Sequence, residues 1–92
     1  MNEKQFTNKP VVSVIKIGTI IEGSGVSERA QVLLCKPVQG MPHCTIVMCF
    51  APKSVYHPYV VWTYNETTGS CNSGDYYRTM SEAAIKFGKR EW

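Results

Sequence analysis

The feature that most constrains the fold is the segment 58–90, which reads as a strand, a polar turn, a short strand and a helix. Every residue from 59 to 64 is aromatic or β-branched, and such residues suit a pleated, half-buried surface. Successive side chains of a strand point to opposite faces, so Val60, Trp62 and Tyr64 share one face. The other face carries Tyr59, Val61 and Thr63. Because both faces are apolar enough to be covered, the pattern favours a central strand.

A turn and a helix follow this strand. Residues 65–74 are a run of turn formers and predict a loop, after which residues 75–78 predict a short strand. Thr79 and Glu82 make a capping box, in which the hydroxyl accepts from the amide three residues on and the carboxylate reaches back to the cap amide. We therefore expect a helix over about 80–89.

Apolar residues recur at helical spacing in this helix and make one stripe, formed by Met80, Ala83, Ala84 and Phe87. We expect the stripe to bury Trp62 or its neighbours on the sheet. Lys86, Lys89 and Arg90 lie in the last turn, where positive charge suits the helix dipole. Gly88 weakens this end of the helix.

The first part of the chain predicts strands joined by loops. Residues 11–22 predict a β-branched strand that bends or bulges at Gly18, or two short strands in its place. Residues 31–36 predict a strand stopped by Pro37, or the end of a helix that begins a few residues earlier, and 44–50 predict a further strand. The remaining segments are expected to be a flexible tail at 1–10, a glycine-rich turn at 23–28, a loop at 37–42 and a polar link at 51–57.

Together these elements predict a single α+β domain over residues 1–92, an antiparallel sheet of four to five strands with a C-terminal helix packed on one face. A hydrophobic content of 43% argues for a folded chain. No apolar run approaches the ~20 residues of a membrane span, and the N-terminus lacks a signal-peptide core. We therefore expect a cytoplasmic protein with no membrane partner.

Catalytic and cofactor motifs are not recognisable, so we expect neither enzyme activity nor a cofactor. Residues 23–28 lack the glycine-lysine-serine/threonine ending of a phosphate-binding loop. Cys44 and Cys49 with His43 leave a metal or thiol site as an alternative, although no second pair of cysteines has zinc-binding spacing. We expect the cysteines to be reduced, with Cys35 and Cys49 acting as small core residues.

Aromatic and basic side chains are the better lead to function. The candidate partner-binding residues are Tyr56, Tyr59, Trp62, Tyr64, Tyr76, Tyr77, Arg78, Lys86, Lys89 and Arg90. Exposed tyrosine, tryptophan and arginine are typical of hot spots on protein interfaces, and the same set can stack on single-stranded bases. The net charge of +3 permits nucleic-acid binding without demanding it, because the basic residues are scattered.

The segment 58–90 resembles small uncharacterised accessory proteins encoded by bacterial phages, plasmids and conjugative elements. The residues that carry the resemblance are 59–62, 74–77, the helix start at 80–84, and Phe87, so it covers about a third of the chain. The resemblance implies an accessory protein of a mobile element that acts by binding, in some cases by inhibiting a host defence complex such as CRISPR–Cas. It implies no catalytic residues.

The leading hypothesis is a non-enzymatic protein-binding accessory module, including an inhibitor of a host or defence complex of the anti-CRISPR type. One alternative is a small nucleic-acid-binding module that uses aromatic stacking with Lys86, Lys89 and Arg90. The other is a metal or thiol protein built on its cysteines and histidines. A homodimer formed through an exposed strand edge or an apolar patch stays open as well.

Overall fold

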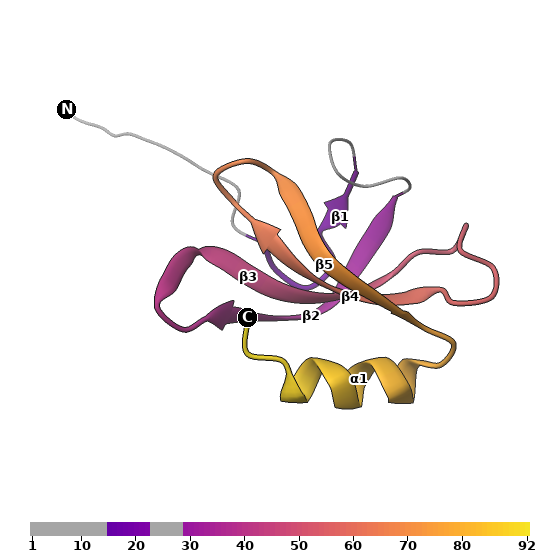
Figure 1. Cartoon of the computed structure of the whole chain (residues 1–92). Coiled ribbons are helices and arrows are strands. Elements are labelled where there is room, and N and C mark those ends of the chain that lie inside the picture. The colour runs from indigo at the N-terminus through magenta and orange to yellow at the C-terminus, as the bar shows by residue number, and fades with distance from the viewer. Residues whose placement is uncertain (1–14, 23–28) are drawn as a thin grey trace.

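The computed structural model describes residues 15–22 and 29–92 (Figure 1). Over these residues the protein is an α+β fold, with a five-stranded antiparallel sheet in the order β1-β2-β3-β4-β5 and a C-terminal helix. The elements are β1 (Ile20–Ile21), β2 (Ala30–Val38), β3 (Met41–Phe50), β4 (Tyr59–Asn65), β5 (Ser70–Tyr77) and α1 (Met80–Lys89). The predicted fold class is confirmed, and β4 is a central strand as its composition indicated.

The strand predicted over 11–22 is wrong for residues 15–19, which form a turn and coil, and is confirmed only for β1. The chain turns at Gly18, whose φ of +93° is a conformation that favours glycine, and this confirms the predicted bend. Ile20 and Ile21 then pair with the start of β2. The expectations for residues 1–14 and for the turn at 23–28 lie outside the described residues.

Strands β2 and β3 extend further than predicted. β2 continues past Pro37 and β3 begins at Met41, so the expected loop over 37–42 shrinks to a turn at Gln39 and Gly40. Pro37 has no amide to donate, but β1 pairs only with the first residues of β2. Proline is tolerated there because the described sheet places no strand beside that part of β2.

The turn between β4 and β5 is also shorter than the predicted loop over 65–74. β5 begins at Ser70, which pairs with Asn65. The side-chain oxygen of Asn65 accepts hydrogen bonds from the amides of Thr67 at 2.8 Å and Thr68 at 3.2 Å, which closes the turn locally. The next turn-forming residues are held in a strand because β4 supplies a complete partner on one side, which overrides their low strand propensity.

The two faces of the sheet bury different side chains. On what we call the inner face, the buried residues are Ile21, Ala30, Val32, Val47, Cys49, Ala51, Val60, Trp62 and Tyr64. On the helix face they are Val38, Cys44, Ile46, Met48, Val61 and Ala83. The predicted alternation along β4 is therefore confirmed, and buried residues of β3 alternate between the two faces in the same way. Helix α1 covers Val61, the neighbour of Trp62, and not Trp62 itself, whose side chain points to the opposite face.

Helix α1 has the predicted bounds and N-cap residue, but its Glu82 carboxylate bonds to the hydroxyl of Thr79 and not to the amide that the capping box predicted. Thr79 is the N-cap and accepts a hydrogen bond from the amide of Glu82 at 3.2 Å. The Glu82 carboxylate accepts from the Thr79 hydroxyl at 3.3 Å. The buried stripe is shorter than predicted, since Ala83 is buried and Ala84 and Phe87 are half-buried while Met80 is exposed.

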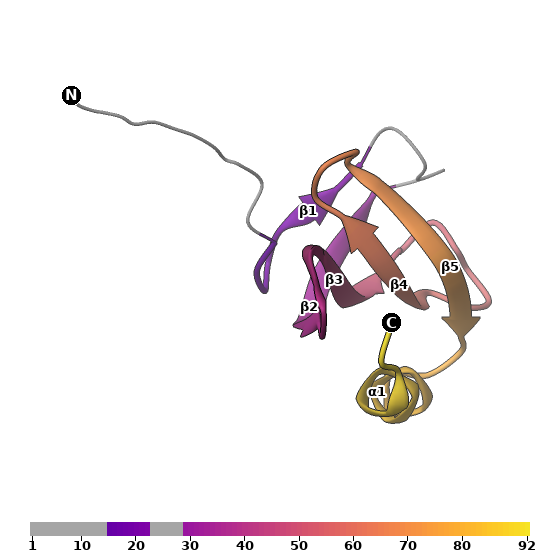
Figure 2. The ribbon, with the colours of Figure 1, turned by 60° about the vertical axis from the view of Figure 1, so that its left-hand side comes forward.

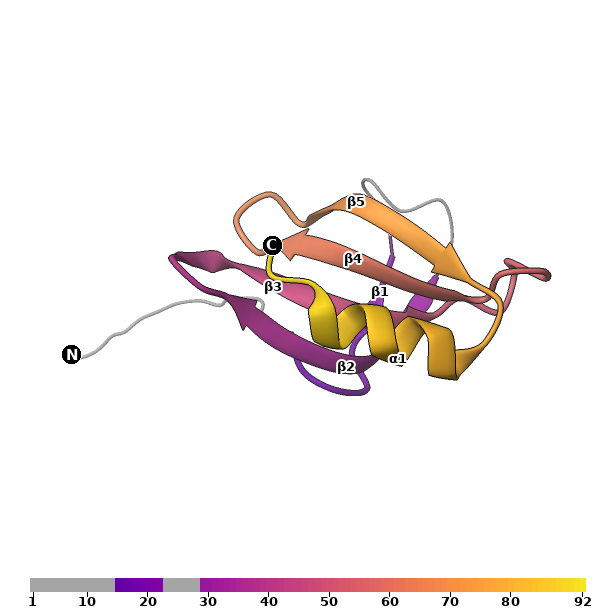
Figure 3. The ribbon, with the colours of Figure 1, turned by 60° about the horizontal axis from the view of Figure 1, so that its bottom comes forward.

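The sheet is curled, with β1 and β5 at its two edges (Figure 2). Helix α1 lies over one face and contacts β3, β4 and β5 (Figure 3). No helix among the described residues is long and apolar enough to span a membrane. The position of α1 over β4 and β5 creates the groove described next.

Candidate binding groove between helix α1 and strand β5

A β-bulge in β5 shapes one wall of the site. The register between β4 and β5 shifts so that Trp62 lies opposite both Ser73 and Gly74. Ser73 has a φ of +56°, a left-handed conformation that few non-glycine residues adopt. A Cβ at Gly74 would overlap Nε1 and Cδ1 of the Trp62 indole, so only glycine lets the indole pack this closely.

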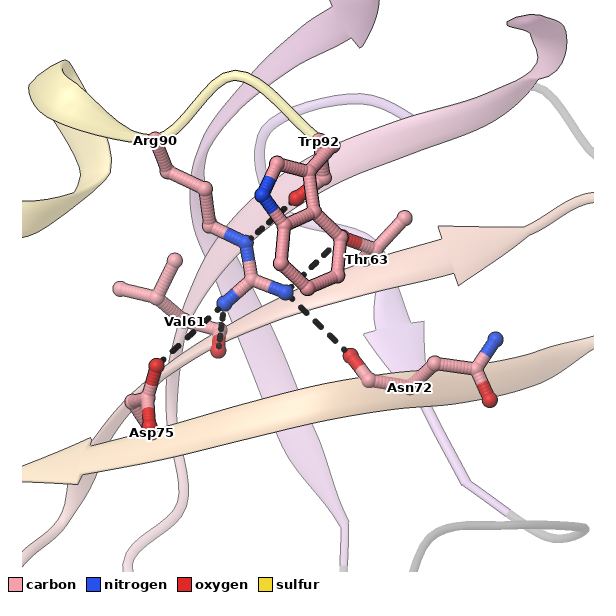
Figure 4. A network of polar contacts seen from close by, with 6 residues as sticks. All are labelled: Val61, Thr63, Asn72, Asp75, Arg90 and Trp92. Carbon is pink, nitrogen blue, oxygen red and sulfur yellow. Dashed lines mark hydrogen bonds and ion pairs between the residues drawn. The ribbon is translucent and has the colours of Figure 1, made fainter.

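Arg90 joins the end of α1 to this bulge (Figure 4). Its guanidinium donates hydrogen bonds to the carbonyl oxygens of Val61 (3.2 Å), Asn72 (3.5 Å) and Trp92 (2.7 Å) and to the hydroxyl of Thr63 (2.9 Å). It also lies 3.6 Å from a carboxylate oxygen of Asp75. The Arg90 side chain is only 11% exposed, so it acts as an internal anchor and not as a free surface cation.

The space between α1 and β5 is an open groove with a volume of about 310 Å³. It is lined by Val61, Ser73, Asp75, Tyr77, Lys86, Lys89, Arg90 and Trp92. This volume is at the lower limit of ligand sites, which run from ~300 to 1,000 Å³. The groove is therefore sized for a side chain or two of a partner.

The charge of the groove is positive. Asp75 and Arg90 offset each other, but Lys86 and Lys89 are exposed and form no ion pair within residues 15–22 and 29–92. Burial, together with the nearby Asp75 carboxylate, raises the pKa of Tyr77, while the guanidinium of Arg90 acts in the opposite direction. Tyr77 is therefore a neutral phenol at physiological pH.

Trp92 supplies an aromatic surface at the rim. Its ring lies 5.4 Å from the guanidinium carbon of Arg90, a cation–π distance, and the residue is 66% exposed. The rim of the groove thus combines two exposed cations with one exposed aromatic ring.

The predicted partner-binding residues divide into three groups. Tyr77, Lys86, Lys89 and Arg90 come together around the groove. Trp62 and Tyr64 are buried on the inner face, which removes them as direct contacts in this structure. Half-buried Tyr59 packs against Phe50, Tyr76 packs edge-on against Trp62, and exposed Tyr56 and Arg78 lie outside the groove lining.

Sequence reasoning missed Val61, Ser73, Asp75 and Trp92. The pairing of Asp75 with Arg90 depends on the bulge, which no local pattern announces. Trp92 carried a usable signal, since a tryptophan directly after a basic helix end has little reason to be core. The aromatic residues of the strand at 59–64 gave a stronger indication of a binding surface than this single tryptophan.

The cysteine alternative meets a geometric obstacle. Cys44 is buried on the helix face and Cys49 on the inner face, because residues five apart in a strand point to opposite sides. These two thiols therefore cannot bind one metal ion. Burial raises the pKa of Cys49 to about 12 and that of Cys71 to about 11, so neither is an activated nucleophile. No metal-binding group of histidine, cysteine or carboxylate side chains occurs within the described ranges.

Comparisons with protein-family models, with curated proteins and with solved structures found no significant match.

Proposed function

We propose that this protein is a non-enzymatic binding module that recognises a segment of another protein in the groove between α1 and β5. The observation that carries the proposal is the grouping of Lys86, Lys89, Tyr77 and Trp92 around a floor fixed by Arg90. Tyrosine and tryptophan are enriched in protein-binding hot spots, and the two lysines beside them give the groove a positive charge that an acidic partner complements. The hydrogen bonds of Arg90 order the floor of the groove in the free protein, so binding loses less conformational entropy there.

The chemistry of the groove supports binding over catalysis. No histidine or cysteine is among the residues that line it. Its carboxylate, on Asp75, is occupied by an ion pair with Arg90. The lining thus offers charge and apolar surface, and it holds neither of the two side chains, histidine and cysteine, that most readily act as base and nucleophile near neutral pH.

A nucleic-acid partner is the second candidate, because Lys86, Lys89 and Trp92 can also hold phosphate and a stacked base. One feature favours protein instead. Arg90, whose planar guanidinium suits phosphate best, already donates to acceptors within the protein.

Pairing of two copies through sheet edges is disfavoured by the edges themselves. β5 carries the bulge at Ser73 and Gly74, and the free part of β2 carries Lys36 and Pro37. Bulges, lysine and proline are the devices that keep sheet edges from pairing. The homodimer stays an alternative that light scattering of the purified chain decides.

The likeness of segment 58–90 to accessory proteins of mobile elements suggests where the partner belongs. In that setting the groove would bind a host protein, and a defence complex of the CRISPR–Cas type is a concrete candidate. Binding of the wild type and of the groove variants to purified complexes of this kind can be measured in the same way as their binding to peptides.

Phage display of random peptides on the immobilised full chain tests the proposal. Selected peptides are measured by fluorescence anisotropy against the wild type and against Lys86→Glu/Lys89→Glu. The control Lys16→Glu/Lys53→Glu makes the same charge change at exposed lysines outside the groove lining. We expect the groove variant to weaken binding by about tenfold or more, equivalent to ~1.4 kcal/mol, and the control to leave it unchanged.

Two results would overturn this function. One is a selection that enriches no peptide, or only peptides that bind both variants equally. The other is tighter binding of labelled single- or double-stranded DNA or RNA at low salt, abolished by Lys86→Glu/Lys89→Glu and steeply salt-dependent, which would assign the groove to nucleic acid.

A further inference from the structure

The spacing of charges at the groove indicates what kind of segment fits it. We infer that the groove takes an extended acidic segment in which two carboxylates, separated by one residue, bind Lys86 and Lys89 while a neighbouring aromatic side chain packs against Trp92 and Tyr77. This inference rests on the proposed function and specifies its ligand. It follows from charge, spacing and volume.

The charge argument starts from the two lysines. Both are exposed, both lie in the last turn of α1, and neither forms an ion pair within the described part of the chain. Lys36 adds positive charge on the other side of the helix end, where its ammonium donates to the carbonyl of Gly88 at 3.3 Å. An anionic ligand is therefore the complement of this surface.

The spacing argument comes from helix and strand geometry. Residues three apart on a helix, as Lys86 and Lys89 are, have Cβ atoms ~5–6 Å apart on one side of the helix. In an extended segment, alternate side chains share a face and lie ~6.6–6.8 Å apart. Carboxylates at alternate positions thus match the two lysines, whereas adjacent carboxylates point to opposite faces.

The volume argument concerns the apolar part of the lining. Val61 and Tyr77 contribute to the lining and Trp92 stands at the rim with 66% of its surface exposed. A groove of about 310 Å³ has room for one large side chain of the segment. An aromatic anchor gains most, because edge-to-face and stacked ring pairs add to its burial.

Designed nonapeptides labelled with fluorescein test the inference by anisotropy. The parent peptide has two glutamates separated by one serine and followed by a phenylalanine, with glycine and serine elsewhere. Three matched peptides replace both glutamates with glutamine, place the glutamates side by side, or replace phenylalanine with alanine. We expect each change to weaken binding to the full chain, and the glutamine change to weaken it by about tenfold.

Charge exchange provides a readout that a merely structural role of the lysines would not move. The variant Lys86→Glu/Lys89→Glu should lose the parent peptide and gain affinity for a peptide with lysines in place of both glutamates. Two glutamates near the C-terminus of α1 oppose the helix dipole and can weaken the helix. The variant Lys86→Ala/Lys89→Ala, which adds no negative charge, is therefore measured as well. It should lose affinity for the parent peptide without gaining affinity for the lysine peptide. Thermal unfolding checks that both variants are folded.

The outcomes separate this inference from the function on which it rests. If the glutamine peptide binds as tightly as the parent, or the exchanged pair gains nothing, the acidic ligand is wrong. If display-selected peptides without carboxylates still need Lys86 and Lys89, the groove binds protein segments and only the ligand class fails. If neither designed nor selected peptides bind, the proposed function fails with it.

Discussion

Arg90 donates a hydrogen bond from Nη2 to the hydroxyl of Thr63 over 2.9 Å, and this bond ties the residue that ends α1 to the middle of β4. The same guanidinium binds the carbonyls of Val61 and Asn72 where the bulge interrupts the ladder between β4 and β5. Arg90, which the sequence predicted as a partner contact, is held by bonds within the protein. In the proposed function we therefore assign it an indirect role, through the position of α1 and Trp92.

Replacing Arg90 should destabilise the fold. Arg90→Ala removes donors from half-buried carbonyl and hydroxyl oxygens, and each buried acceptor left unsatisfied costs about 1–3 kcal/mol, so we expect a loss of about 2–3 kcal/mol in the free energy of unfolding. Arg90→Lys should recover only part, because an ammonium cannot reach several acceptors in one plane. Urea denaturation measures both.

Lys89→Ala is the matched control for Arg90. It removes a neighbouring cation that is exposed and makes no ion pair among the described residues, so the free energy of unfolding should change by less than about 0.5 kcal/mol. Equal losses for Arg90→Ala and Lys89→Ala would show that the network of Arg90 does not hold α1 on the sheet.

Gly74 and Gly88 should respond oppositely to the same substitution. Gly74→Ala forces a methyl group into the Trp62 indole, and such overpacking costs about 1–3 kcal/mol. Gly88→Ala meets nothing within 4 Å and lies inside α1, so it should stabilise the protein by about 0.5–1 kcal/mol. Chemical denaturation followed by tryptophan fluorescence gives both values, and a neutral Gly74→Ala would contradict the packing of Trp62 on the bulge.

The sequence predicted the parts of this protein that have local causes. β-Branched and aromatic residues predicted β4, and alternation predicted its two faces correctly. The pair Thr79 and Glu82 gave the start of α1. The ends of two strands were mispredicted. β2 continues past Pro37 because its unpaired edge does not need the amide that proline lacks. β5 begins already at Ser70 because pairing with β4 overrides the turn preference of its first residues.

The groove was predictable only in part. Lys86, Lys89 and Arg90 were found because they cluster at a helix end, and Tyr77 because aromatic residues gather near it. The distinction between Arg90 as an anchor and its neighbours as free cations depends on acceptors 18 to 29 residues away in sequence. Burial of Trp62 depends on Gly74 across the sheet. Such pairings are set by the register between β4 and β5, and the sequence alone does not determine that register.

The cap of α1 should contribute a measurable share of stability. Thr79→Ala removes the hydroxyl that accepts from the amide of Glu82, and loss of such a cap costs about 1 kcal/mol. Thr79→Ser should retain most of it. The midpoints of thermal unfolding of the wild type and the two variants at neutral pH make the comparison. An alanine variant as stable as the serine variant would show that the cap does not stabilise the fold.

Alkaline pH should destabilise the fold through Cys49. Burial raises the pKa of this thiol from 9.0 to about 12, so the folded protein keeps it protonated while the unfolded chain ionises it above pH 9. The stabilisation is therefore complete below about pH 9 and is lost as pH rises toward 12. At about pH 10, one unit above the unfolded pKa, the loss in the free energy of unfolding is roughly 1.4 kcal/mol. Cys71, with a pKa of about 11, acts in the same direction.

Urea unfolding under reducing conditions at about pH 8 and pH 10 measures the slope of the free energy of unfolding against pH. This slope should be shallower in Cys49→Ala whatever the absolute stability of that variant. Identical slopes would mean that Cys49 ionises in the folded protein as readily as in the unfolded chain, and that the inner face is open to water at β3.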